Sequence, residues 1–169
     1  MARIYDTVII GGGPGGYSAA LYAARAGLDV VVLEKLSAGG QMALTHQVDN
    51  YPGFAEGIDG FTLGMQMQEG AERFGAKTEY AEVESLDMQG DVKTVKTARG
   101  ELKAFGVLLA TGAHPRMIGF KGEEDFKGRG VAYCATCDGE FFTGKEVFVV
   151  GGGFAAAEEA VFLTKYAKH

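Results

Sequence analysis

The sequence contains no tryptophan, only three prolines, three histidines and two cysteines among its 169 residues. No apolar run approaches the ~18 residues needed to span a bilayer, and the first residues lack the apolar segment and cleavage site of a signal peptide. Lysines and arginines form no cluster, and the net charge is -6, so neither nucleic acid nor an anionic membrane is an expected partner. We expect a globular protein of the cytoplasm.

Glycine, in contrast, is abundant, with 27 residues in a chain that is 47% hydrophobic and 22% charged. The hydrophobic and charged shares are typical of a folded domain. Most of the glycines stand beside apolar runs, where they serve as turns or as points of close backbone approach.

The first 35 residues have the pattern of a βαβ unit. A β-branched run over residues 5–10 predicts a buried parallel strand, a glycine turn follows, and a helix ends at Gly27. A second strand over residues 29–35 completes the unit. Its length of about 30 residues is that of one mononucleotide-binding half.

Gly11, Gly13 and Gly16 have the spacing G-x-G-x-x-G. Gly11 allows a tight turn, Gly13 lets a pyrophosphate approach the backbone, and Gly16 lets the helix pack close to the strand. Glu34 ends the next strand, where a carboxylate can accept both ribose hydroxyls but would repel a 2'-phosphate. The motif predicts a site for FAD or NAD rather than NADP. The alternative is a turn that binds nothing.

The rest of the first half is more varied. Residues 37–60 form a glycine-rich polar loop that is too long to be a simple connector, and residues 61–75 have an imperfect helical pattern. Residues 77–111 alternate polar and apolar with two turns, which predicts three antiparallel strands followed by a buried one. Pro115 and the glycines that follow indicate a boundary.

We predict one domain over residues 1–113 and a second over residues 114–169. The second contains a weak internal repeat, because residues 145–167 align without gaps on residues 5–27. The glycine spacing recurs at Gly151, Gly153 and Ala156. The repeat predicts a strand, a turn and a helix, but the second strand that would complete a βαβ unit is missing. We therefore expect the chain to be part of a longer protein.

Both cysteines lie in the stretch Cys134-Ala135-Thr136-Cys137, which Asp138 follows. Zinc would need further ligands, and the histidines are scattered, so we predict no metal site. A disulfide closing so short a loop would constrain little of the unfolded chain. The spacing suits redox exchange, in which one thiolate attacks a partner disulfide and the second resolves the mixed disulfide, with Asp138 moving the proton. Buried inert thiols are the alternative.

With these motifs, the chain resembles the N-terminal half of the low-molecular-weight, bacterial-type thioredoxin reductases. The shared stretches are CATCDG, GGQ at 39–41, VDNYPGF at 48–54, LLATGA at 108–113 and the paired glycine turns. The resemblance implies an α/β fold, with a Rossmann-like FAD-binding domain and the start of an inserted, second Rossmann-like NADPH domain that carries the disulfide.

The resemblance also implies cofactor contacts. The residues that would hold FAD are Gly11, Gly13, Pro14, Gly16, Glu34, Gly40, Gln41, Asn50, Ala110, Thr111 and Gly112. The residues that would hold NADPH are Gly151, Gly153 and Ala156. Family members usually have small polar residues after the second turn, whereas this chain has FAA, which leaves room for reduced ferredoxin as donor.

Finally, the resemblance implies a path for electrons, from NADPH through FAD to the disulfide and on to thioredoxin or a similar small redox protein. Cys137 would face the flavin, Cys134 would exchange with thioredoxin, and Asp138 would donate the proton. The full-length protein would be a homodimer, and this chain alone would be inactive. The alternatives are a ferredoxin-fed or peroxiredoxin-reductase-type flavoprotein and a non-catalytic nucleotide-binding fragment.

Overall fold

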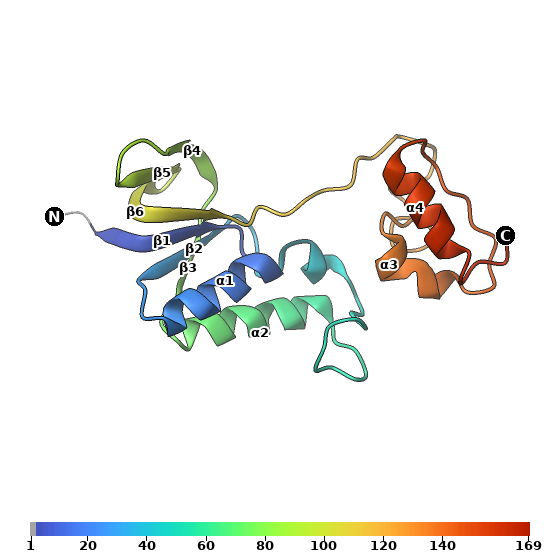
Figure 1. The fold of residues 1–169 in the computed structure, drawn as a ribbon, viewed down its shortest axis with the longest axis horizontal. Helices are drawn as coiled ribbons and strands as arrows, with labels where there is room; N and C mark the ends of the chain where they lie inside the picture. Colours follow the sequence, from blue (N-terminus) through green and yellow to red (C-terminus); the bar gives the residue numbers. More distant parts are fainter. Residues whose placement is uncertain (1–2) are drawn as a thin grey trace. The chain divides into compact units, whose positions relative to one another are not determined.

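The computed structural model describes residues 3–169, which divide into two compact units that meet between His114 and Pro115 in the sequence. The first unit is a six-stranded sheet with helices (Figure 1). Its strands are β1 (Ile4–Ile10), β2 (Val30–Glu34), β3 (Lys77–Tyr80), β4 (Val83–Asp87), β5 (Lys93–Thr97) and β6 (Gly100–Leu109). Its helices are α1 (Pro14–Arg25), α2 (Gly60–Glu72) and the short 3-10 helix η1 (Gly40–Leu44).

The strand order is β3-β2-β1-β6-β5-β4. The pairs β3–β2, β2–β1 and β1–β6 are parallel, and the pairs β6–β5 and β5–β4 are antiparallel. Helix α1 forms the crossover from β1 to β2 and α2 forms the crossover from β2 to β3, whereas the antiparallel strands β4, β5 and β6 follow one another through short connections. The predicted α/β fold, with a Rossmann-like βαβ unit and a three-stranded antiparallel ribbon, is confirmed.

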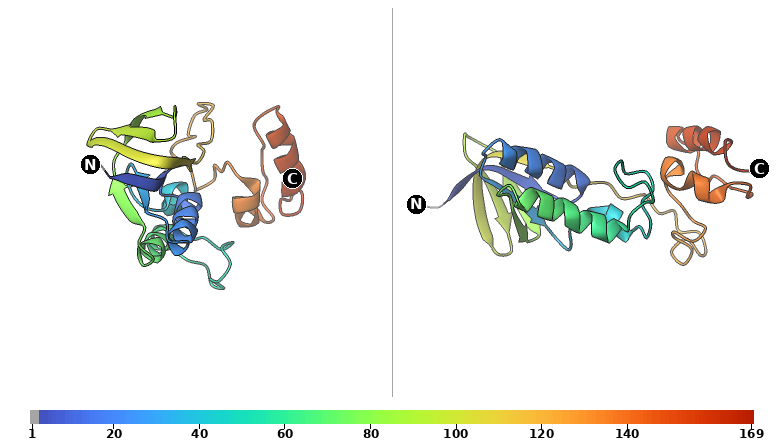
Figure 2. Two further views of the ribbon diagram at one scale, coloured as in Figure 1. Left: turned by 60° about the vertical axis from the view of Figure 1, so that its left-hand side comes forward. Right: turned by 90° about the horizontal axis from the view of Figure 1, so that it is seen from below.

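The core lies on both faces of β1 and β2, as their unbroken apolar runs predict. On one face, Ile9 and Val32 pack with Tyr17 of α1. On the other face, Val8 and Leu33 pack with apolar side chains of the ribbon. Figure 2 shows α1 and α2 side by side against the sheet. Burial of each of these valine, leucine and isoleucine side chains contributes about 1.5–3 kcal/mol.

Two details of the strands differ from the prediction. Lys77–Tyr80 pairs in parallel with β2 and is not part of the ribbon. Strand β6 is continuous over ten residues, and its predicted burial is wrong, because Phe105 is 56% and Leu109 is 63% exposed. Leu109 lies beside Ile10 in the strand register, on the face of the sheet away from α1 and α2, so these helices do not cover it.

The second unit contains α3 (Ala135–Asp138), the 3-10 helix η2 (Gly139–Phe142) and α4 (Phe154–Leu163). Helix α4 starts at the position that the repeat makes equivalent to the start of α1. Residues 145–150 do not form the predicted strand, because a strand needs a neighbour along its length. Its backbone hydrogen bonds join it to the last residues instead, with Val147 N–H donating to the His169 carbonyl at 2.8 Å and Lys168 N–H donating to the Lys145 carbonyl at 2.8 Å.

Within residues 3–169, no helix combines the length and the apolar character needed to cross a membrane.

The close contact at the start of α1 predicts that a side chain at Gly16 destabilises the protein. A Cβ placed at Gly16 would lie 1.9 Å from the Gly11 carbonyl oxygen, which is backbone and cannot move aside. We expect Gly16→Ala to lower the free energy of unfolding by about 2–4 kcal/mol, measured by urea denaturation. Gly15→Ala is the matched control, because a Cβ there meets nothing within 4 Å. It should change stability by less than about 1 kcal/mol. Equal effects of the two substitutions would contradict this account.

Candidate functional site

The first glycine turn joins the end of β1 to the start of α1. Gly11 has a φ of +107°, in the region that favours glycine, and a Cβ there would lie 2.2 Å from the Ala110 carbonyl oxygen. Its N–H donates to the Leu33 carbonyl at 2.9 Å. Gly13 differs, because a Cβ at this position would meet nothing within 4 Å. The turn is therefore tightly packed against the protein at Gly11 and open at Gly13.

Helix α1 begins directly at this open side. Gly13 is its N-cap residue and Pro14 occupies its first turn, where the missing N–H of proline costs nothing. No side chain caps this end of the helix, and its first turn contains no acidic residue. The amide groups of the first turn and the positive end of the helix dipole are therefore available to a phosphate group.

Glu34 ends β2 beside the glycine turn. Its Oε2 accepts a hydrogen bond from Gly12 N–H at 2.7 Å, and its Oε1 accepts one from Leu36 N–H at 2.9 Å. Two backbone amides thus hold the carboxylate in one orientation at the end of the parallel strands. This edge of the sheet lies at β1, where the strand order reverses between β2 on one side and β6 on the other, and α/β sheets bind ligands at such a point.

The GGQ loop also contacts the glycine turn. Gly39 N–H donates to the Gly12 carbonyl at 2.8 Å, and a Cβ at Gly40 would lie 3.4 Å from Gly13 Cα. Gln41 lies further along η1, where its Nε2 is 3.3 Å from Nδ1 of His114.

The segment after β6 reaches the same place, because Ala110 N–H donates to the Ile10 carbonyl at 2.8 Å. Thr111 and Gly112 follow directly, and Gly112 has a φ of +73°. The structure thus brings together the ends of β1, β2 and β6 and the start of η1. The candidate FAD residues that these contacts join are Gly11, Gly13, Gly16, Glu34, Gly40 and Ala110.

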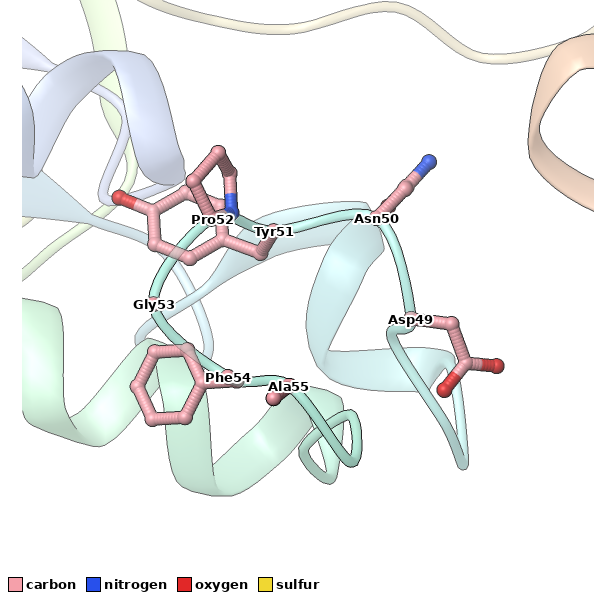
Figure 3. Close-up of a pocket in the computed structure, with 7 residues that line it drawn as sticks. All are labelled: Asp49, Asn50, Tyr51, Pro52, Gly53, Phe54 and Ala55. Carbon is pink, nitrogen blue, oxygen red and sulfur yellow. The ribbon is translucent and has the colours of Figure 1, made fainter.

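Asn50 lies on a separate recess of the surface, lined by residues 49–55 (Figure 3). The rings of Tyr51 and Phe54 have centroids 6.1 Å apart, and the Asn50 side chain points away from them. No contact described for residues 3–169 joins Asn50 to the glycine turn, so its role as a cofactor contact stays a prediction.

In the second unit, Cys134 and Cys137 form a disulfide with an S–S distance of 2.15 Å and a Cα–Cα distance of 5.3 Å. Cys134 is the N-cap residue of α3, so its extended backbone and the first helical turn bring the two sulfurs together. Sγ of Cys134 also lies 3.3 Å from the Thr136 hydroxyl oxygen. Thr136 was not among the predicted site residues, although it lies inside the C-x-x-C stretch.

Asp138 ends α3 directly after Cys137, and its N–H donates to the Cys134 carbonyl at 3.1 Å. Burial raises the pKa of the Asp138 carboxyl above its ordinary value of 3.8. A carboxyl group whose neutral form is favoured in this way is suited to donate a proton to a thiolate close to it in the chain.

The second glycine turn has the backbone of the first. Gly151 has a φ of +147°, and Gly153 is the N-cap of α4, as Gly13 is of α1. A Cβ at Gly151 would lie 3.1 Å from the Ala156 Cβ, which explains a small residue at that position. Phe154 is 90% exposed at the first position of α4. The turn itself is formed, and its role in binding NADPH stays a prediction.

Comparison with known proteins agrees with this geometry. The sequence family described as Pyridine nucleotide-disulphide oxidoreductase matches residues 5–169. The chain belongs to this family. Two curated relatives and one solved structure show which branch of the pyridine nucleotide-disulphide oxidoreductases it resembles.

The thioredoxin reductase of Peptoclostridium litorale is 48% identical over 168 residues, which are 99% of this chain and 53% of that protein. The bifunctional thioredoxin reductase/thioredoxin of Mycobacterium leprae (strain TN) is 49% identical over 98% of this chain and 36% of that protein. The crystal structure of thioredoxin reductase from Streptococcus pyogenes MGAS5005 is 46% identical, with a TM-score of 0.91, and is matched over 99% of this chain and 55% of that one. The expected resemblance is confirmed, and the chain spans about half the length of the first and third of these proteins.

The raised pKa of Asp138 generates the second prediction. A carboxyl whose pKa is raised by folding stabilises the protein below its unfolded pKa, and this contribution is lost as the pH rises through the folded pKa. We therefore expect Asp138→Asn to be more stable than the unchanged chain at pH 7, and this difference to shrink at acidic pH. Urea midpoints across this range measure it. A stability difference for Asp138→Asn that does not depend on pH would contradict the prediction.

Proposed function

We propose that the whole protein is a flavoprotein disulfide reductase that passes electrons from NADPH through FAD to the Cys134–Cys137 disulfide and on to thioredoxin or a similar small redox protein. The observation that carries the proposal is the disulfide itself, because a C-x-x-C pair at bonding distance is the form that would accept two electrons. The membership of the chain in the pyridine nucleotide-disulphide oxidoreductases supports the rest of the path.

The residues around the first glycine turn fit an adenine dinucleotide. Gly13 leaves open space where a pyrophosphate would lie, and α1 presents uncapped amides there. The Glu34 carboxylate, held by Gly12 and Leu36, can accept hydrogen bonds from ribose hydroxyls. Its negative charge opposes a 2'-phosphate, which favours FAD over NADP at this turn. A bound FAD would supply the conversion of hydride equivalents into electrons for the disulfide.

The second unit supplies the exchange chemistry. Reduction of the disulfide takes two electrons and two protons and leaves two thiols. The thiolate of Cys134 then attacks one sulfur of a partner disulfide, and the partner's other sulfur leaves and takes up a proton. The thiolate of Cys137 attacks Cys134 in the mixed disulfide, so the protein disulfide forms again and the partner is released as a dithiol. The Cys134 and Cys137 thiols each lose one proton when they become thiolates, and the two partner sulfurs each take up one. In this scheme Asp138 donates the proton that the first leaving sulfur takes up.

We also propose that the two units bind different cofactors. Residues 1–113 belong to an FAD domain, and residues 114–169 begin the NADPH domain, in which Gly151, Gly153 and Ala156 contact the nucleotide. We further propose a cytoplasmic homodimer for the full-length protein. The 169-residue chain alone should show little turnover, since it spans about half of the relative from Peptoclostridium litorale.

The third prediction concerns flavin binding. We expect the purified chain to take up FAD, and Glu34→Ala to weaken this binding by about tenfold or more, since a hydrogen bond to a charged group contributes about 1.5–3 kcal/mol. Fluorescence quenching of FAD on titration with the chain measures the affinity. Glu82→Gln is the matched control, because Glu82 is an exposed carboxylate paired with Lys35 next to β2. If the unchanged chain binds no FAD, the alternative of a non-catalytic fragment is favoured.

The fourth prediction concerns the cysteines. In the full-length protein, Cys134→Ser and Cys137→Ser should each abolish NADPH-dependent reduction of thioredoxin while leaving the flavin spectrum in place. Parallel assays with NADPH, NADH and reduced ferredoxin separate the proposed reductase from a ferredoxin-fed relative. Undiminished thioredoxin reduction by either variant would exclude the proposed path.

A further inference from the structure

Glu123 is a buried carboxylate that the exchange chemistry above does not use. It lies in the second unit, eleven positions before Cys134, and only 2% of its surface is exposed. A buried charge must be compensated by hydrogen bonds, because its removal from water is otherwise strongly unfavourable. The hydrogen-bond donors to this carboxylate therefore indicate which parts of the chain it holds in place.

Three donors surround the carboxylate. Its Oε2 accepts a hydrogen bond from Gly119 N–H, and its Oε1 accepts one from Ile118 N–H at 3.2 Å. The third donor is the hydroxyl of Tyr133, at 2.9 Å from Oε1. Burial raises the pKa of the Glu123 carboxyl, but the hydrogen bonds from these donors outweigh it, so the pKa lies below its ordinary value and the group is ionised at neutral pH.

The three donors come from two places in the chain. Ile118 and Gly119 lie before the carboxylate, whereas Tyr133 lies ten residues after it and directly precedes Cys134. Between them the chain is folded back on itself, with Val131 N–H donating to the Phe126 carbonyl at 2.9 Å. The Tyr133 hydroxyl thus links the end of this folded loop to a buried anion immediately before the first sulfur of the disulfide.

We infer that Glu123 is a positioning residue for the redox pair: by holding the Tyr133 hydroxyl, it fixes the backbone from which Cys134 projects and so favours closure of the Cys134–Cys137 disulfide. The inference rests on the proposed function, in that it takes this pair to be opened and closed during exchange. Its physical basis is the effective concentration of the two thiols. This concentration is higher when both backbone segments are held than when one of them fluctuates.

The reaction that reports this effect is exchange with dithiothreitol. When the protein dithiol meets oxidised dithiothreitol, the Cys134–Cys137 bond forms and the reagent's S–S bond breaks. Two electrons and two protons pass from the protein to the reagent. A looser Cys134 should lower the equilibrium constant for this closure.

The experiment measures this equilibrium constant in the 169-residue chain, by trapping free thiols with an alkylating agent and determining the mass of the product. Tyr133→Phe removes the one hydroxyl and leaves both backbone bonds to the carboxylate intact. Glu123→Gln removes the charge and replaces one acceptor oxygen with an amide nitrogen that cannot accept. Glu124→Gln is the matched control, since that neighbouring carboxylate is exposed.

We expect Tyr133→Phe and Glu123→Gln each to lower the equilibrium constant about threefold or more, and Glu124→Gln to leave it unchanged. Because the two residues act through one hydrogen bond, the double variant should lose less than the product of the two single effects. If Glu123→Gln does not fold, Tyr133→Phe still decides the question. An unchanged constant for Tyr133→Phe overturns the inference, because the link to Cys134 would then have no effect on closure. A wild-type pair that cannot be reversibly reduced would instead refute the proposed function, and the inference with it.

Discussion

The first unit depends on one close contact of backbone with backbone, where the turn after β1 meets the first turn of α1 and the segment after β6. A Cβ at Gly11 or Gly16 would lie 2.2 Å or 1.9 Å from a carbonyl oxygen, so only glycine allows the three segments to approach. Because β1 is the central strand on which the parallel part of the sheet is built, this contact fixes the direction in which α1 leaves the sheet. It also brings Ala110 to the turn.

The same contact lies beside the candidate dinucleotide site. The Glu34 carboxylate is held by Gly12 and Leu36 amides, and Gly39 is tied to the Gly12 carbonyl. These hydrogen bonds hold the turn from both sides, and a turn held in this way loses little conformational entropy when it binds a ligand. The recess at residues 49–55 belongs to a loop that these hydrogen bonds do not reach.

In the second unit, the chemistry is concentrated in one short stretch of chain. The disulfide, the carboxyl of Asp138 and the hydroxyl of Thr136 all lie within α3 or at its start. A helix of this length has little stability of its own, so its position must come from contacts with the surrounding chain. Packing of Gly139 against α4 provides one such contact, and the bond between Tyr133 and Glu123 provides another. The redox pair is therefore held from both of its ends.

Local pattern was sufficient to predict β1, β2, α1, α2 and the ribbon, because each of these has a periodicity or a turn signal that a short window of sequence contains. The glycine spacing likewise predicted both turns, since Gly11 and Gly151 have the positive φ that glycine adopts without steric cost. Tertiary structure alone decided which strands pair, and it placed Lys77–Tyr80 beside β2 and left Leu109 exposed. It also decided that Glu123 is buried against Tyr133, because burial and hydrogen bonding between segments depend on how the chain folds back, which no local pattern of residues specifies.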